Sequence, residues 1–258
     1  RKGTKPQASI GLGCLYDVMN RMILESDCCK CKFDEMRLAE EQIDRVRETI
    51  GASQPFLVVM DRGYPSTAAF IRMMEKGILF LVRLKSSDYK KEQSALSGPD
   101  GWVDILLDKS RINHYKGTDI GQRMEELGSV TLRMVKVSLQ EEREEILITN
   151  LPSETFDRFQ IAELYQMRWG IETAYETLKD RLQIENFTGT KPVLLLQDIY
   201  STIYIRNLAE DIIRDAEAEL DEKEKRRKHK MMINRTLSIG ILKNDLIYIL
   251  PSTSLNVH

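Results

Sequence analysis

A short apolar run that ends in a carboxylate constrains the fold more than any other stretch of the chain. Residues 56–60 read Phe-Leu-Val-Val-Met, and Asp61 follows at once. A continuous apolar run of this length is typical of a strand that is buried on both faces of a sheet. A carboxylate at the end of such a strand lies at the edge of the core, where ligands gather in open α/β sheets. The run therefore predicts an α/β fold and a candidate site at Asp61.

The segments around this run alternate between strand and helix patterns, as an α/β fold requires. Asp34 and Ser66 stand where helix N-caps belong, and Gly51 and Gly77 stand where helices end. We expect these elements in chain order: strands at 7–16 and 18–25 forming a hairpin, a helix at 33–50, a helix at 67–76 and a strand at 78–84.

Residues 160–190 predict one long helix with a polar face. The stretch has no proline, and a single glycine, Gly170, interrupts good helix formers. At about 100° per residue, four polar side chains fall within a stripe roughly 60° wide: Tyr165, Arg168, Glu172 and Lys179. Apolar residues at other positions would seat the helix on a core: Ile161, Leu164, Ile171, Leu178 and Leu182.

The spacing Tyr-x2-Arg-x3-Glu-x6-Lys resembles the signature of DDE transposases of the insertion-sequence-four family. The stretch Asp61-Arg62-Gly63-Tyr64 is also similar to that family, and the resemblance covers the chain from about Lys2 to Leu250. It implies that Asp61 and Glu172 are the second and third catalytic, metal-binding carboxylates. It also implies a set of DNA-contacting residues: Arg62, Tyr64, Tyr165, Arg168, Trp169 and Lys179.

The resemblance further implies a ribonuclease-H-like fold, a mixed sheet flanked by helices with a β-rich insertion before the last catalytic helix. In that fold three carboxylates hold two Mg²⁺ ions, which Mn²⁺ can replace. The expected partners are transposon ends and target DNA, with a homodimer on paired ends. The expected reaction is DNA cleavage at the ends of an insertion element, followed by strand transfer.

A change of character after residue 85 suggests how the chain is divided. Ser, Gly, Pro and Asp cluster at residues 86–100, and short β-like runs follow at 102–107, 130–137 and 145–149. Within them, Trp102 is a candidate for stacking on a displaced base, although a core role is commoner. We expect four parts: 1–85, the first part of the core; 86–153, a β-rich insertion; 154–220, the second part of the core; and 221–258, a charged linker with a C-terminal helical segment.

The first catalytic Asp has no candidate in this sequence. The resemblance places it on the first core strand, before the equivalent of Arg1, and Asp17 lies in or beside the expected hairpin turn. We therefore expect an N-terminally truncated piece that lacks the first Asp and its strand. Unpaired strand hydrogen bonds would follow from that loss, so we expect the piece alone to be weakly folded or inactive.

Composition narrows the class of protein. The net charge is −2 and the pI about 6.1, whereas general nucleic-acid binders are usually basic. A nuclease core needs only a local basic groove, and the one strong basic run lies at 223–230. No apolar run is long enough to span a bilayer, and no signal peptide is evident, so we expect a cytoplasmic protein. The resemblance implies that it works in the bacterial cytoplasm and acts on the nucleoid. The Cys28–Cys31 cluster lacks a second cluster at zinc-finger spacing, so reduced thiols are expected.

Three other interpretations stay open at this point. The polar stripe on residues 160–190 could be a solvated face with Glu-to-Lys pairs, each worth a few tenths of a kcal/mol. The chain could be a ribonuclease-H-like nuclease without strand transfer. It could also be a non-catalytic DNA-binding remnant, which the missing first Asp favours.

Overall fold

The computed structural model describes residues 10–30, 33–138, 144–223, 233–235 and 237–242. The chain divides into two compact units. We call residues 1–42 with 169–258 the hairpin unit, and residues 43–168 the sheet unit. One boundary falls inside a helix, and the other falls between Arg168 and Trp169, within the polar motif.

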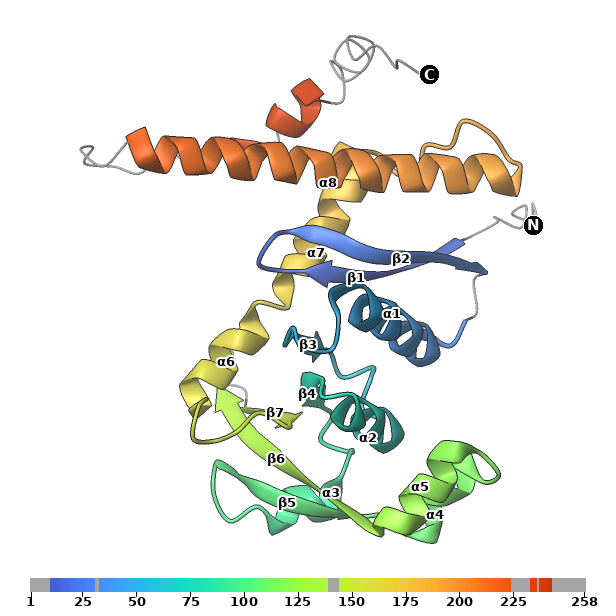
Figure 1. Cartoon of the computed structure of the whole chain (residues 1–258), viewed down its shortest axis with the longest axis vertical. Helices are drawn as coiled ribbons and strands as arrows, with labels where there is room; N and C mark the ends of the chain where they lie inside the picture. Colours follow the sequence, from blue (N-terminus) through green and yellow to red (C-terminus); the bar gives the residue numbers. More distant parts are fainter. Residues whose placement is uncertain (1–9, 31–32, 139–143, 224–232, 236, 243–258) are drawn as a thin grey trace, which may run out of the picture. The chain divides into compact units, whose positions relative to one another are not determined.

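In the hairpin unit, strands β1 (Ile10–Asp17) and β2 (Met22–Lys30) pair in antiparallel fashion (Figure 1). Asp17 makes the turn because its carboxylate accepts hydrogen bonds from the backbone N–H groups of Met19 and Asn20. The predicted hairpin is confirmed. The second strand, predicted at 18–25, is displaced along the chain: it begins at Met22 and runs to Lys30, so Cys28 and Cys29 lie on it.

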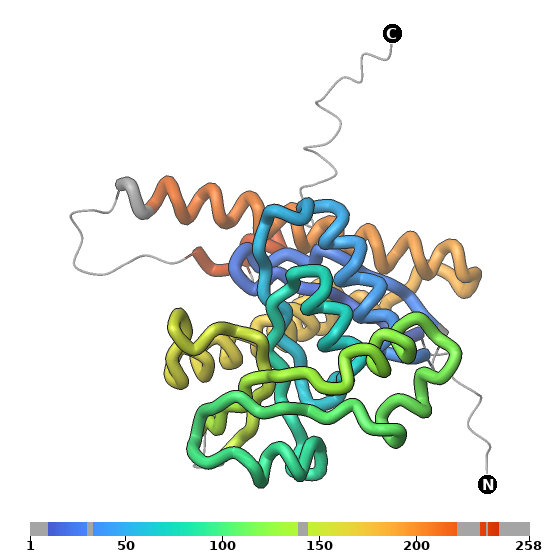
Figure 2. The backbone as a smooth tube through the Cα atoms, turned by 60° about the horizontal axis from the view of Figure 1, so that its bottom comes forward, coloured from blue at the N-terminus to red at the C-terminus, as the bar shows by residue number. Residues whose placement is uncertain are grey.

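A long helix, α8 (Pro192–Lys223), runs beside β2 (Figure 2). Its Asn207 side chain accepts from the N–H of Ile23 and donates to the carbonyl of the same residue, as a neighbouring strand would. Apolar side chains from β2, the motif region, α8 and residues 237–242 form the core of this unit: Ile23, Leu178, Leu182, Ile184, Ile199, Ile203, Ala209, Ile213 and Ile239.

Helix α1 (Glu35–Ile50) begins and ends where the caps predicted. Asp34 accepts from the N–H groups of Met36 and Arg37, and Gly51 takes a positive φ of 79°. The first half of the helix lies against β1, where a Cβ at Gly13 would stand 2.5 Å from Leu38. Glycine at this position therefore allows the helix to approach the strand closely.

The sheet unit is built on five strands in the order β3-β4-β7-β6-β5. Strands β3 and β4 are parallel, and the other pairs are antiparallel, so the sheet is mixed. The strand bounds are β3 Leu57–Met60, β4 Leu79–Leu84, β5 Asp100–Leu106, β6 Ser129–Ser138 and β7 Glu144–Thr149. The strands predicted from residues 86–153 thus continue the same sheet as β3 and β4. The four-part division of the sequence stays a prediction.

Helices cover both faces of this sheet. Helix α2 (Thr67–Glu75) is capped by Ser66, as predicted, and its Phe70 ring stacks on Phe80 of β4 at 4.8 Å between centroids. Helix α6 (Arg158–Gln166) covers the other face through Ile161 and Tyr165. That second face is closed by an apolar cluster: Leu81, Val135, Val137, Leu147, Leu151, Ile161 and Tyr165.

The stretch between β4 and α6 holds helices that the sequence pattern did not predict. They are α3 (Lys90–Ala95), α4 (Lys109–Ile112), the 3-10 helix η1 (Asn113–Tyr115) and α5 (Asp119–Leu127). All are shorter than three turns, too short for a helical period to stand out in the sequence. Thr118 and Asp108 cap two of them through side-chain oxygens.

The single helix predicted over residues 160–190 is wrong in its continuity. Three segments replace it: α6, α7 (Trp169–Glu176) and the π-helix η2 (Thr177–Arg181). A tight turn at Met167 and Arg168 separates the first two, because the Arg168 N–H donates to the carbonyl of Tyr165, three residues back. The helix ends after Leu182, since Gln183 takes a left-handed φ of 53°.

Two further expectations concern the end of the chain. Pro192 begins α8, within the part expected as the second part of the core, as proline does at the first position of a helix. Residues 221–223, expected to begin a charged linker, belong to α8; the rest of that linker, 224–232, and residues 243–258 lie outside the described residues. In the described part of the chain, no helix has the length and apolarity needed to cross a membrane.

Candidate active site

Asp61 follows β3 directly, at the edge of the sheet where the parallel strands β3 and β4 end. The parallel register pairs Met60 with Val82, so the residues after them, Asp61 and Arg83, come next to each other in the same direction. A turn follows, in which the N–H of Tyr64 donates to the Asp61 carbonyl at 3.1 Å. The carboxylate therefore sits at the edge where the apolar run predicted it.

Three groups surround the Asp61 carboxylate. Its Oδ1 accepts from the backbone N–H of Arg62 at 2.7 Å and from the hydroxyl of Tyr165 at 3.2 Å. The Nη1 of Arg83 stands 3.9 Å from the same oxygen. The side chain remains 39% exposed, which leaves room for a further ligand.

These neighbours keep the carboxylate ionised. Burial raises the pKa of Asp61, but the Arg62 N–H, the charges of Arg168 and Arg83 and the Tyr165 hydroxyl together lower it below its ordinary value. The pKa of Tyr165 moves the other way, to about 12, because of burial and of the nearby Asp61 charge. Near neutral pH the pair is therefore an anionic carboxylate and a neutral hydroxyl that donates to it.

Arg83 is a site residue that our sequence analysis missed. Its Nε donates to Glu145 of β7 at 2.8 Å, and its Nη2 pairs with the other oxygen of that carboxylate. This two-point pairing leaves Nη1 directed toward Asp61. The sequence did contain a signal for this role, since Arg83 is a charged residue within the otherwise apolar run predicted as a strand at 78–84.

Helix α6 brings Tyr165 to the carboxylate. A capping box starts the helix: Asp157 accepts from the N–H groups of Phe159 and Gln160, and the Gln160 side chain accepts from the N–H of Asp157. Tyr165 is 2% exposed, so packing fixes its ring on the sheet. The Arg168 guanidinium lies over that ring, 5.8 Å from its centroid.

Glu172, Lys179 and Trp169 belong to the hairpin unit. Glu172 is half-buried in the first turn of α7, Trp169 is 59% exposed, and Lys179 is exposed on η2. Gly170 brings α7 close to the hairpin, since a Cβ there would stand 3.2 Å from the Tyr16 ring. The glycine in the motif is thus explained by close packing.

The sequence-predicted residues therefore fall into two groups. The structure brings Asp61, Tyr165 and Arg168 together in the sheet unit, with Arg62 exposed and Tyr64 half-buried in the turn after Asp61. The remaining three lie across the unit boundary, on α7 and η2. The parts assigned to all of these residues in catalysis and DNA binding stay predictions.

The metal expectation can be compared with the donor atoms present. Asp61 supplies an ionised, partly exposed carboxylate, and oxygen donors of this kind suit Mg²⁺. Among the residues that the structure describes, no three His, Cys, Asp or Glu side chains gather in a metal-binding group. The donor chemistry of Asp61 fits a divalent ion.

Comparison with known proteins decides the family. Residues 2–208 match the family described as transposase DDE domain. The chain belongs to this family. The transposase DDE domain thus covers the sheet unit, both halves of the motif and the first half of α8.

Curated relatives of this DDE domain are bacterial. A putative transposase InsL for insertion sequence element IS186A of Escherichia coli K12 is 32% identical over 69 residues, which is 27% of this chain and 19% of that protein. The transposase for insertion sequence element IS421 of Escherichia coli matches equally well over the same shares. The match spans about a fifth of the length of these relatives.

A solved structure supports the fold. The piggyBac transposase in its synaptic complex with hairpin DNA covers all of this chain and half of its own, at a TM-score of 0.52 and 10% identity. At this identity the likeness concerns the fold alone. It confirms the predicted α/β, ribonuclease-H-like class for this DDE domain.

Proposed function

We propose that this chain is the catalytic domain of a DNA transposase, which cuts DNA at the ends of an insertion element and joins the 3′-hydroxyl to target DNA. Family membership supports the reaction class. The observation that carries the proposal is the Asp61 carboxylate at the edge of the sheet. It is ionised and accepts a hydrogen bond from Tyr165 of α6.

Four residues of the sheet unit have distinct parts in this proposal. Asp61 offers oxygen atoms to a divalent cation. Tyr165 orients the carboxylate, since its buried hydroxyl already donates to it. Arg168 and Arg83 place positive charge beside Asp61, where they can neutralise the phosphate of a bound DNA strand.

Glu172 supplies a second carboxylate in this proposal, and the first Asp of the three-carboxylate set has no candidate in this sequence. The support for Glu172 is the motif spacing, which places it one helical turn after Arg168 in the sequence. Two Mg²⁺ ions, or Mn²⁺ in their place, would supply activation of the attacking hydroxyl and stabilisation of the leaving oxygen. Lys179, Arg62, Tyr64 and Trp169 would bind the DNA backbone or bases nearby.

The finer assignment follows from the motif. We place the chain in the insertion-sequence-four group of DDE transposases, because all four motif residues are present at that group's spacing. Its partners would be transposon ends and target DNA, with two copies acting on paired ends. Its site of action would be the bacterial cytoplasm, at the nucleoid, as for elements carried in bacterial chromosomes.

A strand-transfer assay tests the proposal. The substrate is a pre-cleaved duplex with a free 3′-hydroxyl, taken from the DNA that flanks the coding sequence, together with supercoiled target plasmid and Mg²⁺ or Mn²⁺. Any joined products should disappear with a chelator and in the Asp61→Asn variant. Glu163→Gln is the matched control, since Glu163 is an exposed carboxylate on α6 outside the site.

The other outcomes separate the alternatives. Metal-dependent cleavage without joining would indicate a nuclease without strand transfer. DNA binding without any cleavage would indicate a non-catalytic remnant. Joining that survives Asp61→Asn would refute the proposed site even though a transposase is present.

A further inference from the structure

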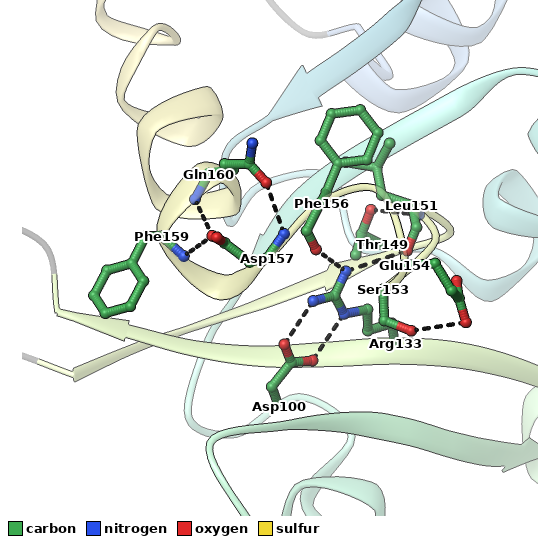
Figure 3. A network of polar contacts seen from close by, with 10 residues as sticks. All are labelled: Asp100, Arg133, Thr149, Leu151, Ser153, Glu154, Phe156, Asp157, Phe159 and Gln160. Carbon is green, nitrogen blue, oxygen red and sulfur yellow. Dashed lines mark hydrogen bonds and ion pairs between the residues drawn. The ribbon is translucent and has the colours of Figure 1, made fainter.

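A buried arginine bonds the sheet to the backbone just before helix α6 (Figure 3). Arg133 of β6 is 1% exposed. Its Nε and Nη2 donate to the two oxygens of Asp100 at 2.7 and 2.5 Å. Its Nη1 donates to the carbonyl of Phe156 at 2.7 Å and, more weakly, to that of Leu151 at 3.5 Å.

Stability alone is a weak reason for such a pair. Removing a guanidinium from water carries a large cost, and replacing a buried ion pair by apolar residues of similar size is often neutral or stabilising. What apolar residues cannot replace is the bond to two backbone carbonyls. Arg133 is therefore best understood through the segment whose carbonyls it holds, residues 151–156.

That segment leads straight into α6. Phe156 precedes Asp157, the N-cap whose capping box starts the helix. On the other side, Thr149 donates to the carbonyl of Phe80 and accepts from the N–H of Leu151. Asn150 pairs with backbone groups of residues 78 and 80 in both directions. The connection from β7 to α6 is thus bonded to β4 at one end and to Arg133 at the other.

We infer that Arg133 is a positioning residue: with Asp100, it fixes the start of α6 so that Tyr165 meets Asp61 two turns later. Packing of Ile161 and Tyr165 holds the helix on the sheet, but apolar burial has no fixed direction. The bond to Phe156 sets its position along the axis. The inference rests on the proposed function only for the catalytic meaning of Asp61.

A double-mutant cycle in the full chain tests this coupling. Tyr165→Phe is made in the natural background and in the paired variant Arg133→Met with Asp100→Leu. The measurement is the amide hydrogen-exchange protection of Leu147 and Ile148, central residues of the sheet unit. We expect Tyr165→Phe to lower protection about fivefold in the natural background and by less than twofold in the paired variant.

A second tyrosine provides the matched control. The hydroxyl of Tyr89 also hydrogen-bonds within the sheet unit, to Thr67 at 2.9 Å, and has no contact with the α6 connection. Tyr89→Phe should lower protection by the same factor in both backgrounds. An unchanged Tyr165→Phe effect would overturn the inference, and so would a loss of both effects, which indicates general loosening.

Two additions keep the test decisive. If the paired variant does not fold, Arg133→Lys takes its place, because lysine keeps the charge toward Asp100 but has one nitrogen in place of the planar fork that reaches Asp100 and the carbonyls with separate nitrogens. The cycle needs no DNA or metal, so its result stands apart from the transposase assay. In an active preparation, Arg133→Lys should lower the rate of strand transfer about tenfold and leave the DNA concentration for half-saturation within twofold.

Discussion

The two halves of the motif are held by different forces. In the sheet unit, packing seats the Tyr165 ring, but polar contacts join Tyr165 and Arg83 to Asp61, and a buried arginine bonds the backbone just before the helix that carries the tyrosine. In the hairpin unit, apolar packing around Leu178 and close contact at Gly170 seat the helix that carries Glu172. The half of the motif in the sheet unit thus surrounds the charge of Asp61, whereas the half in the hairpin unit packs on an apolar core.

This difference indicates where each half tolerates change. Residues held by a few polar bonds depend on the direction of those bonds, so isosteric replacements there should lower the reaction rate more than the stability. A helix held by apolar packing depends on the volume of its side chains, so truncation of those side chains should lower stability first. The following predictions separate these two effects.

The largest effect should come from the two carboxylates. If Asp61 and Glu172 serve one metal pair, each of Asp61→Asn and Glu172→Gln should lower strand transfer by more than about a hundredfold, since even residues behind metal ligands cost 10–100-fold. The double variant should be no worse than either single one. Rates from pre-cleaved DNA ends measure this. A double variant whose losses multiply would mean that the two residues act in separate steps.

Truncation of the core should be next in size. Leu178→Ala in the hairpin unit and Leu147→Ala in the sheet unit should each lower the free energy of unfolding by about 2–5 kcal/mol. Each unit contains one of the two tryptophans, Trp169 and Trp102 respectively. Denaturant titrations in Trp102→Phe and Trp169→Phe backgrounds report the units separately. Equal shifts at both probes for either variant would show that the units unfold as one.

The polar half should respond to loss of Arg83. Arg83→Met removes a cation 3.9 Å from Asp61, so we expect strand transfer to fall about tenfold. The control is Arg123→Met, which removes an exposed arginine paired with Glu75 and Glu126 in the same unit. A similar loss in both variants would mean that net charge, and not the place of Arg83, determines the rate.

The smallest effect should be on the pH dependence of stability. The folded pKa of Asp61 lies below its unfolded value of about 3.9, so its ionised form stabilises the fold above that pH, and the contribution is lost as the pH falls through the folded pKa. The free-energy difference between the natural chain and Asp61→Asn should therefore be constant from about pH 5 to 8 and narrow below about pH 4. Denaturant titrations across this range measure it, and a flat difference down to pH 3 would contradict the pairing.

The sequence was most informative where chemistry and periodicity coincide. The apolar run before Asp61 predicted both the strand and the place of the carboxylate, and Asp34, Ser66 and Gly51 predicted helix ends, because caps are local interactions. Tyr165 could be named from the motif spacing. That its hydroxyl meets Asp61 could not, since the two residues are 104 positions apart in the chain.

The misses have a common cause in tertiary contacts. Arg83 and Arg133 are charged residues in strands, and their value depends on Glu145 and Asp100, which come from other strands. The break after Gln166 leaves no mark in propensity, because Met167 and Arg168 are good helix formers. We attribute the break to the packing of α6 on the sheet unit and of α7 on the hairpin unit.

The π-helix η2 bears on how relatives of this chain can differ in length. A π-helical turn contains one more residue than the α-helical turn it replaces, and here the N–H of Leu182 donates to the carbonyl of Thr177, five residues back. A homologue that lacks one residue in this segment could revert to α-helical bonding and still bury its leucines. The stretch from Thr177 to Leu182 is therefore where an evolutionary deletion would be absorbed most easily, and searches for distant homologues should allow a gap there.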